Sequence, residues 1–125
     1  MLNKISEFEV QALAYWELKK VFPIVRGEYK VAMSQEELKK IPLDENGNRG
    51  RRVHARFDIV IFDSKEEMKL IIEVKKSAES NSFKQADRYM ELTGVPCIYI
   101  RGMKEAEDAI NIVDKYLANR KIVIE

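Results

Sequence analysis

Three side chains that can act together on a phosphate ester lie within the segment RFDIVIFDSKEEMKLIIEVKKS, residues 56–77. Asp58 and Glu73 interrupt runs of Ile, Val and Phe, and Lys75 follows Glu73 by two residues. Carboxylate oxygens are the ligands that Mg²⁺ and Mn²⁺ prefer, and both cations accept phosphate oxygens as further ligands. A neighbouring lysine can orient or deprotonate a water and stabilise charge that develops on phosphorus. The pattern therefore points to a divalent-cation site if the fold brings these side chains together.

The connection between the two apolar runs decides how the acids meet. We expect strands over about Val53–Phe62 and Lys69–Lys75. The intervening DSKEEM is too short for a parallel crossover, so the strands should form an antiparallel hairpin. With the turn centred in the middle of DSKEEM, Asp58 stands opposite Glu73, at a Cβ separation of about 4.5–5.5 Å. A slip of one residue in register would reverse both faces of the hairpin.

Alternation along the strands sorts the other side chains. It puts Asp58, Glu73 and Lys75 on one face. Opposed carboxylates repel each other, and one of them has its pKa raised unless something such as a bound cation compensates. The alternative is that Glu73 and Lys75 are solvent-facing residues of a half-exposed strand. The opposite face is expected to supply the core with Phe57, Ile59, Ile61, Leu70, Ile72 and Val74.

The first part of the chain predicts a helix, a strand and an insertion. Apolar residues recur at helical spacing over about 7–20, with Ser6 as the N-cap and Glu9 completing a capping box. Pro and β-branched residues then favour a strand over 24–32. A short second helix and the basic loop DENGNRGRR fill an insertion over 33–52.

The last part of the chain completes an α/β fold with a central mixed sheet flanked by helices. A helix capped by Ser82 runs to about Leu92, and Gly94 follows as its C′ residue. The all-apolar run VPCIYI predicts a strand buried on both faces and reached by a parallel crossover. A last helix spans about 104–118, and KIVIE could form a final edge strand. The expected order α-β-β-β-α-β-α makes residues 1–125 one domain.

Composition excludes several classes of site. With 46% hydrophobic and 34% charged residues the chain can bury a core, and its net charge of +1 says nothing about a nucleic-acid partner. Cys97 is the only cysteine and His54 the only histidine, which excludes an internal disulfide and a cysteine-based zinc site. No apolar run approaches the roughly 20 residues that cross a membrane. We therefore expect a soluble, cytoplasmic protein with no membrane partner.

FDIVIFD followed by LIIEVKKS resembles the PD-(D/E)xK nuclease superfamily, which has the restriction-endonuclease-like fold. In this resemblance Asp58 is the motif aspartate and residues 73–75 are the ExK. The resemblance covers about 6–100 and looks closest to small prokaryotic nucleases and nuclease domains of restriction-type motor subunits. Phe57 stands where the proline of the motif would precede the aspartate, as in many branches of the superfamily.

The resemblance implies a metal-dependent endonuclease that hydrolyses phosphodiester bonds in DNA. Asp58, Glu73 and the backbone carbonyl of Val74 would hold Mg²⁺ or Mn²⁺, and Lys75 would activate the attacking water. The resemblance also allows a homodimer or a larger restriction or recombination complex. The alternative is a non-catalytic DNA-binding or accessory subunit on the same fold.

Two further positions follow from the resemblance. An acid of the first helix approaches the metal in such nucleases, and we favour Glu7 because the capping box already explains Glu9. The other interpretation of Glu7 is a favourable charge at a helix N-terminus. Gln85 and Tyr89 match a QxxxY segment. Gln85 would reach the catalytic site or a phosphate while Tyr89 packs or contacts DNA; otherwise Tyr89 is a core residue and Gln85 a surface amide.

Basic residues are expected to border the acids. Phosphodiester backbones are bound by Lys and Arg, so such a border suits a DNA partner. The alternative is a solvated basic loop without a ligand. The candidate nucleic-acid-binding residues are Arg51, Arg52, Arg56, Lys76, Lys84, Arg88 and Tyr89.

Overall fold

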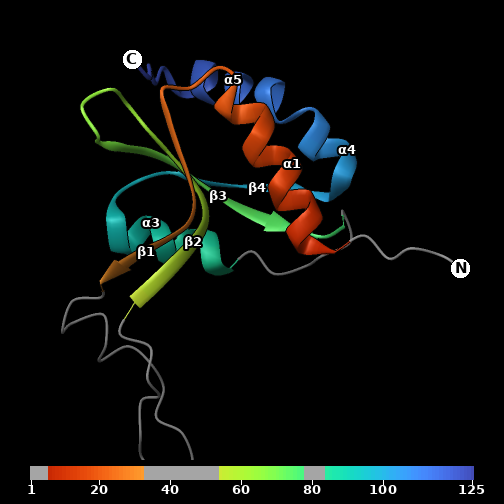
Figure 1. The fold of residues 1–125 in the computed structure, drawn as a ribbon. Helices are drawn as coiled ribbons and strands as arrows, with labels where there is room; N and C mark the ends of the chain where they lie inside the picture. The colour runs from red at the N-terminus through yellow and green to blue at the C-terminus, as the bar shows by residue number, and fades with distance from the viewer. Residues whose placement is uncertain (1–5, 33–53, 78–83) are drawn as a thin grey trace, which may run out of the picture.

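The structure is a computed structural model that describes residues 6–32, 54–77 and 84–125. It has the α/β architecture expected from the sequence, with a four-stranded mixed sheet flanked by helices (Figure 1). The expected insertion over 33–52 lies outside the described residues. The elements are α1 (Glu7–Lys19), β1 (Ile24–Ala32), β2 (His54–Phe62), β3 (Met68–Lys75), α3 (Lys84–Thr93), β4 (Cys97–Arg101), α4 (Gly102–Glu107) and α5 (Ala109–Arg120).

The sheet has the strand order β1-β2-β3-β4. β2 pairs with both β1 and β3 in antiparallel fashion, which confirms the predicted hairpin. β4 pairs with β3 in parallel fashion after the chain has passed through α3, which confirms the predicted crossover. Within the described ranges no helix is both long and apolar enough to cross a bilayer.

Both faces of the sheet are covered by apolar residues, which explains why β2 and β3 read as nearly continuous apolar runs. One face packs against α1, α4 and α5, which lie together on one side of the sheet in Figure 1. Its central residues include Ile59, Ile61, Leu70, Ile72 and Val74. The opposite face packs against α3 through Phe57, Val60, Phe62, Ile71, Tyr89 and Cys97.

The expected placement of Phe57 with Ile59 is wrong. Phe57 packs on the α3 face, whereas Ile59 packs on the α1 face. On the neighbouring strand β1 the side chains also change face between Gly27, which pairs with Ile59, and Tyr29, which pairs with Phe57. Glu28, between these two residues, has a positive φ of 49°. A positive φ interrupts the pleat, so the simple alternation of faces does not carry through this part of β1 and β2.

The β2–β3 hairpin has the predicted register over its central part. Ile59 pairs with Ile72 and Ile61 with Leu70, and an irregularity follows between Ile61 and Phe62. At the tip, Asp63 accepts hydrogen bonds at Oδ1 from the backbone N–H groups of two loop residues, each at 2.9 Å. This carboxylate organises the loop that fixes the register.

The C-terminal part differs from the expectation in two places. The single helix expected over 104–118 is two helices, α4 and α5, which meet at Asp108. KIVIE forms no strand, because Lys121 ends α5 in the left-handed conformation at φ 55° and the chain turns back onto the core. Ile122 and Ile124 pack against the α1 face, and the Ser64 hydroxyl donates to the Glu125 carbonyl at 2.6 Å.

Gly94→Ala should lower the free energy of unfolding by about 1–2 kcal/mol, the cost of a left-handed conformation for a residue with a Cβ. Gly94 has φ 72° and donates its N–H to the Met90 carbonyl at 2.8 Å, as a C′ residue does. An added Cβ would meet no atom within 4 Å, so the cost is conformational alone. Urea denaturation followed by circular dichroism measures it, and Gly94→Asn is the control expected to cost less. An alanine variant as stable as the parent would contradict the assignment.

Candidate functional site

Asp58 and Glu73 meet where β2 and β3 part. Regular backbone pairing of the two strands reaches Ile59 opposite Ile72. Beyond this pair, backbone N–H groups donate to the carboxylates of Asp58 and Glu73. The Val74 N–H donates to Asp58 Oδ2 at 2.8 Å, and the Asp58 N–H donates to Glu73 Oε1 at 3.4 Å. The predicted juxtaposition of the two acids is therefore present, and each carboxylate is held by a backbone donor of the other strand.

Glu73 is a buried acid. It is 4% exposed. Burial, and next the neighbouring Asp58 carboxylate, raise the pKa of Glu73 to about 8, while the Asp58 N–H and the Lys75 ammonium act to lower it. The fold thus places two acids together, and the net effect of burial and of the neighbouring groups is a raised pKa for Glu73.

Lys75 lies on the same face of β3 as Glu73. Ile71 packs on the α3 face, and Glu73 and Lys75 follow it at alternate positions of the strand. The Lys75 Nζ lies 5.8 Å from the centroid of the Tyr99 ring, on β4. The ExK residues are thus arranged as the hairpin geometry predicts.

Gln11 links α1 to the acidic strand. Its Nε2 donates to the backbone carbonyl of Asp58 at 3.2 Å. Gly27 of β1 also approaches that carbonyl, and a Cβ built on it would lie 3.9 Å from both the carbonyl oxygen and Gln11 Nε2. Gln11 lies one helical turn beyond Glu7 on α1, a position that the resemblance also marks.

Glu7 is not gathered with the two acids. Within residues 6–32, 54–77 and 84–125 no three His, Cys, Asp or Glu side chains cluster closely enough to hold a metal ion. Glu7 and Glu9 are both exposed in the first turn of α1. Ser6 Oγ accepts from the Glu9 N–H at 3.2 Å, which confirms the predicted N-cap. An exposed acid at the N-terminus of α1 is explained by its favourable interaction with the helix dipole.

Tyr89 has the packing role. It is 8% exposed, its hydroxyl donates to the Arg56 carbonyl at 3.2 Å, and its ring meets Phe57 edge-on at a centroid distance of 4.6 Å. Burial, and next the charge of Glu73, raise the pKa of Tyr89 to about 12. Tyr89 therefore supports the strand that carries Asp58. Lys84 and Gln85 lie in the first turn of α3, and their side chains are outside the described part of the chain.

Exposed cations occur on β2, in the segment that directly follows β3, and on α3. Arg56 precedes Asp58 by two residues on β2, Lys76 directly follows the ExK, and Arg88 lies on α3 next to Tyr89. All three side chains are exposed. Arg51 and Arg52, expected beside them, lie outside the described residues.

The donor set of Asp58 and Glu73 suits a small divalent cation. Each ionised carboxylate has about four acceptor positions, so one backbone hydrogen bond leaves capacity for a metal. Hard oxygen donors fit Mg²⁺ or Mn²⁺, and Mg²⁺ typically keeps several waters, so two protein carboxylates suffice. A cation between the acids would also offset the burial and the repulsion from Asp58 that together raise the pKa of Glu73.

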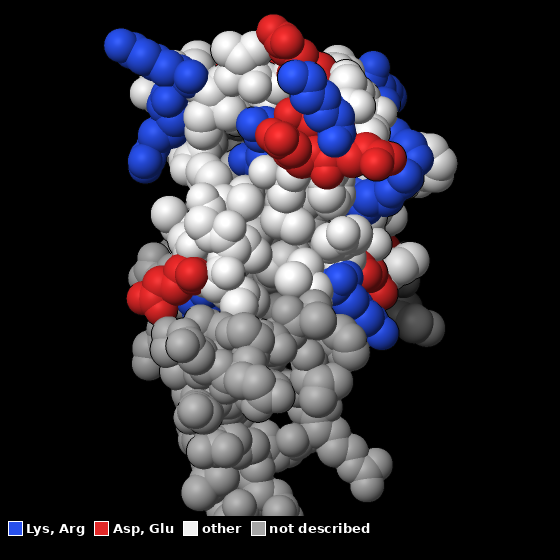
Figure 2. Space-filling model, turned by 90° about the vertical axis from the view of Figure 1, so that its left-hand side faces the viewer, with Lys and Arg blue, Asp and Glu red and all other residues white. Residues whose placement is uncertain are grey.

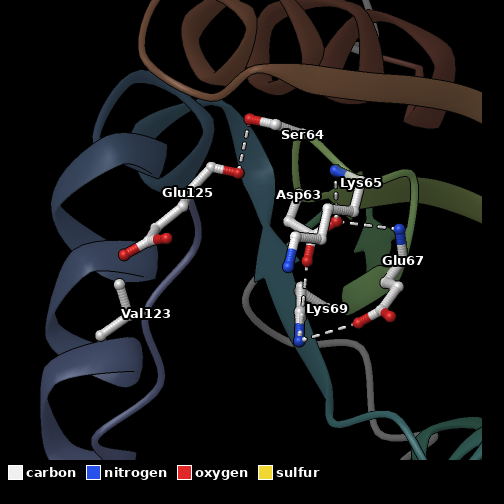
Figure 3. A pocket seen from close by; sticks show the side chains of 7 residues that line it. All are labelled: Asp63, Ser64, Lys65, Glu67, Lys69, Val123 and Glu125. Carbon is white, nitrogen blue, oxygen red and sulfur yellow. Dashed lines mark hydrogen bonds and ion pairs between the residues drawn. The ribbon is translucent and has the colours of Figure 1, made fainter.

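A separate hollow lies at the hairpin tip, about 16 Å along the strand from Asp58 at the usual rise per residue. It has a volume of about 450 Å³. Charged side chains of both signs crowd this end of the molecule in Figure 2, and Figure 3 shows that they pair with one another and with the loop backbone. Lys69 Nζ, for example, lies 3.8 Å from Asp63 and 3.6 Å from Glu67. These contacts explain the charges as supports of the hairpin loop.

No protein-family model, curated protein or solved structure matches the chain. The function is therefore inferred from the site itself. Its distinguishing feature is the pair of opposed acids with a lysine on the same strand face.

Glu73→Gln should stabilise the metal-free protein more at pH 8 than at pH 5. The raised pKa means that folded Glu73 keeps a proton that the unfolded chain releases, so the stability of the parent falls as the pH rises from about 4.5 to about 8. The amide does not ionise, so the Tm advantage of the variant should grow by at least about 4 °C over this range, the shift that roughly 1 kcal/mol produces.

Thermal unfolding in EDTA at several pH values measures this advantage. Glu91→Gln, which neutralises an exposed acid on α3, is the matched control and should show no such growth. A Tm difference between Glu73→Gln and the parent that stays constant with pH would contradict the assignment of Glu73 as a buried acid with a raised pKa.

Proposed function

We propose that this protein is a Mg²⁺- or Mn²⁺-dependent endonuclease that hydrolyses phosphodiester bonds in DNA. The observation that carries the proposal is the pair of carboxylates, Asp58 and Glu73, interlocked across β2 and β3 through the Val74 and Asp58 N–H groups. Lys75, on the same face of β3, completes a set with the chemistry of phosphodiester hydrolysis.

The architecture supports the same proposal. An antiparallel β1-β2-β3 unit followed by a helix and a parallel β4 is what we expect of a restriction-endonuclease-like fold. Asp58 and Glu73 follow the last regular pair of β2 and β3, Ile59 opposite Ile72, and the Val74 and Asp58 N–H groups hold the two carboxylates there. We assign the chain to this fold as part of the proposal.

The proposed roles follow from position. Asp58 and Glu73, with the Val74 carbonyl, would hold the cation, which when bound supplies positive charge to the phosphate and polarises its oxygens. Lys75 Nζ would orient the attacking water, whose oxygen bonds to phosphorus as the bond to the leaving oxygen breaks; the water loses one proton and the leaving oxygen gains one. Gln11 would position Asp58 through its backbone carbonyl.

A non-catalytic DNA-binding subunit is the second candidate. It is favoured by one observation, namely that only two acids gather in the described part of the chain. Such a protein would bind DNA in a salt-dependent way and leave it intact.

Glu73→Gln and Lys75→Met should each lower the rate of Mn²⁺-dependent nicking of supercoiled plasmid by at least about 100-fold. The first removes a proposed ligand of the cation and the second a positioned acid–base group, and each contributes at least this much. Gel separation of nicked from supercoiled plasmid measures the rate. Asp114→Asn removes an exposed acid from α5 and is the control expected to cut like the parent.

The same assay separates the two candidates. Cleavage by Glu73→Gln at the parental rate would exclude catalysis at this site. A parent that binds plasmid in a salt-sensitive way but never nicks it with Mg²⁺ or Mn²⁺ would favour the non-catalytic subunit.

A further inference from the structure

Two cations lie side by side where β3 and β4 end. The parallel register sets Glu73 beside Tyr99 and Lys75 beside Arg101. Lys75 Nζ lies 5.8 Å and Arg101 Cζ 5.2 Å from the centroid of the same Tyr99 ring. Arg101 and Tyr99 were not expected from the sequence as site residues.

The ring of Tyr99 lies beside both cations. A cation within about 6 Å of an aromatic centroid is attracted to the ring, and here one ring attracts both. Tyr99 is partly buried against the α3 face, so it is a fixed platform. The guanidinium and the ammonium are therefore held on neighbouring strands, which are about 4.8 Å apart.

The backbone at Arg101 is also well fixed. Its N–H donates to Glu105 Oε1 at 2.9 Å, across the junction where β4 turns directly into α4. Gly102 makes that turn with φ 75°. The tight junction ties the position of Arg101 to the strand and the following helix rather than to a long loop.

We propose that Lys75 and Arg101 form a phosphate subsite beside the acid pair, which takes a backbone phosphate of the bound nucleic acid. A phosphate diester carries the charge that two adjacent cations attract, and the guanidinium of Arg101 can engage two of its oxygens at once. The subsite rests on the proposed function, because it lies next to Glu73 and would present the strand to Asp58 and Glu73.

Arg101→Gln tests the subsite without a metal. The measurement is the affinity of a fluorescein-labelled DNA duplex in EDTA over a range of KCl concentrations. Loss of one phosphate contact should reduce the slope of log K against log salt by about 0.9. The same loss should weaken binding roughly eightfold at about 0.1 M KCl. Arg101→Lys keeps the charge and should restore the slope while it remains weaker than the parent.

Arg120→Gln is a matched control. Arg120 also lies over a tyrosine ring, 5.3 Å from the centroid of Tyr116, but on α5. Its loss should leave the affinity and the salt slope unchanged. A parental slope and affinity in Arg101→Gln would overturn the subsite while leaving Mn²⁺-dependent cleavage standing.

Two other outcomes are also decisive. A parent that neither binds duplex nor nicks plasmid would overturn the proposed function and the subsite together. Weaker binding by Arg101→Gln that is accompanied by a lower Tm and is not restored by Arg101→Lys would show a structural role for Arg101, and would also overturn the subsite.

Discussion

The repulsion between two carboxylates is the constraint around which this fold is arranged. If both acids were ionised, two charges about 5 Å apart, the usual spacing of opposed cross-strand residues, would repel each other by roughly 3 kcal/mol at an effective dielectric constant of about 20; in the metal-free protein Glu73 therefore keeps its proton up to about pH 8. Glu73 is 4% exposed, so water does little to screen its part of that repulsion. A protein keeps such a pair when something else requires it, and a bound divalent cation is the simplest requirement that fits oxygen donors alone.

The neighbouring elements hold this pair in place. The strands stop pairing at Ile59 and Ile72, and their N–H groups turn to the two carboxylates instead. α1 reaches the same point from one side through Gln11, and α3 supports it from the other through Tyr89. Buried polar groups without partners are costly, and every polar side-chain atom buried in the described residues has a partner.

The sequence allowed the strands, the hairpin and the opposed acids to be predicted, because apolar runs and a short connection leave few registers to choose from. Local backbone conformation could not be predicted in the same way. Phe57 lies on the other face where the paired strand has a positive φ at Glu28, and the residue type does not predict this angle, since glutamate rarely adopts that conformation. The position of Arg101 beside Lys75 was not predicted because it depends on the β3–β4 register.

The most direct test of the central claim is a crystal structure of the protein grown with Mn²⁺, with anomalous diffraction recorded to locate the ion. We predict a strong anomalous peak between the carboxylates of Asp58 and Glu73, within about 2.0–2.3 Å of an oxygen from each, the range of divalent-cation bonds to oxygen. A folded protein at saturating Mn²⁺ with no peak between these two side chains would contradict the account.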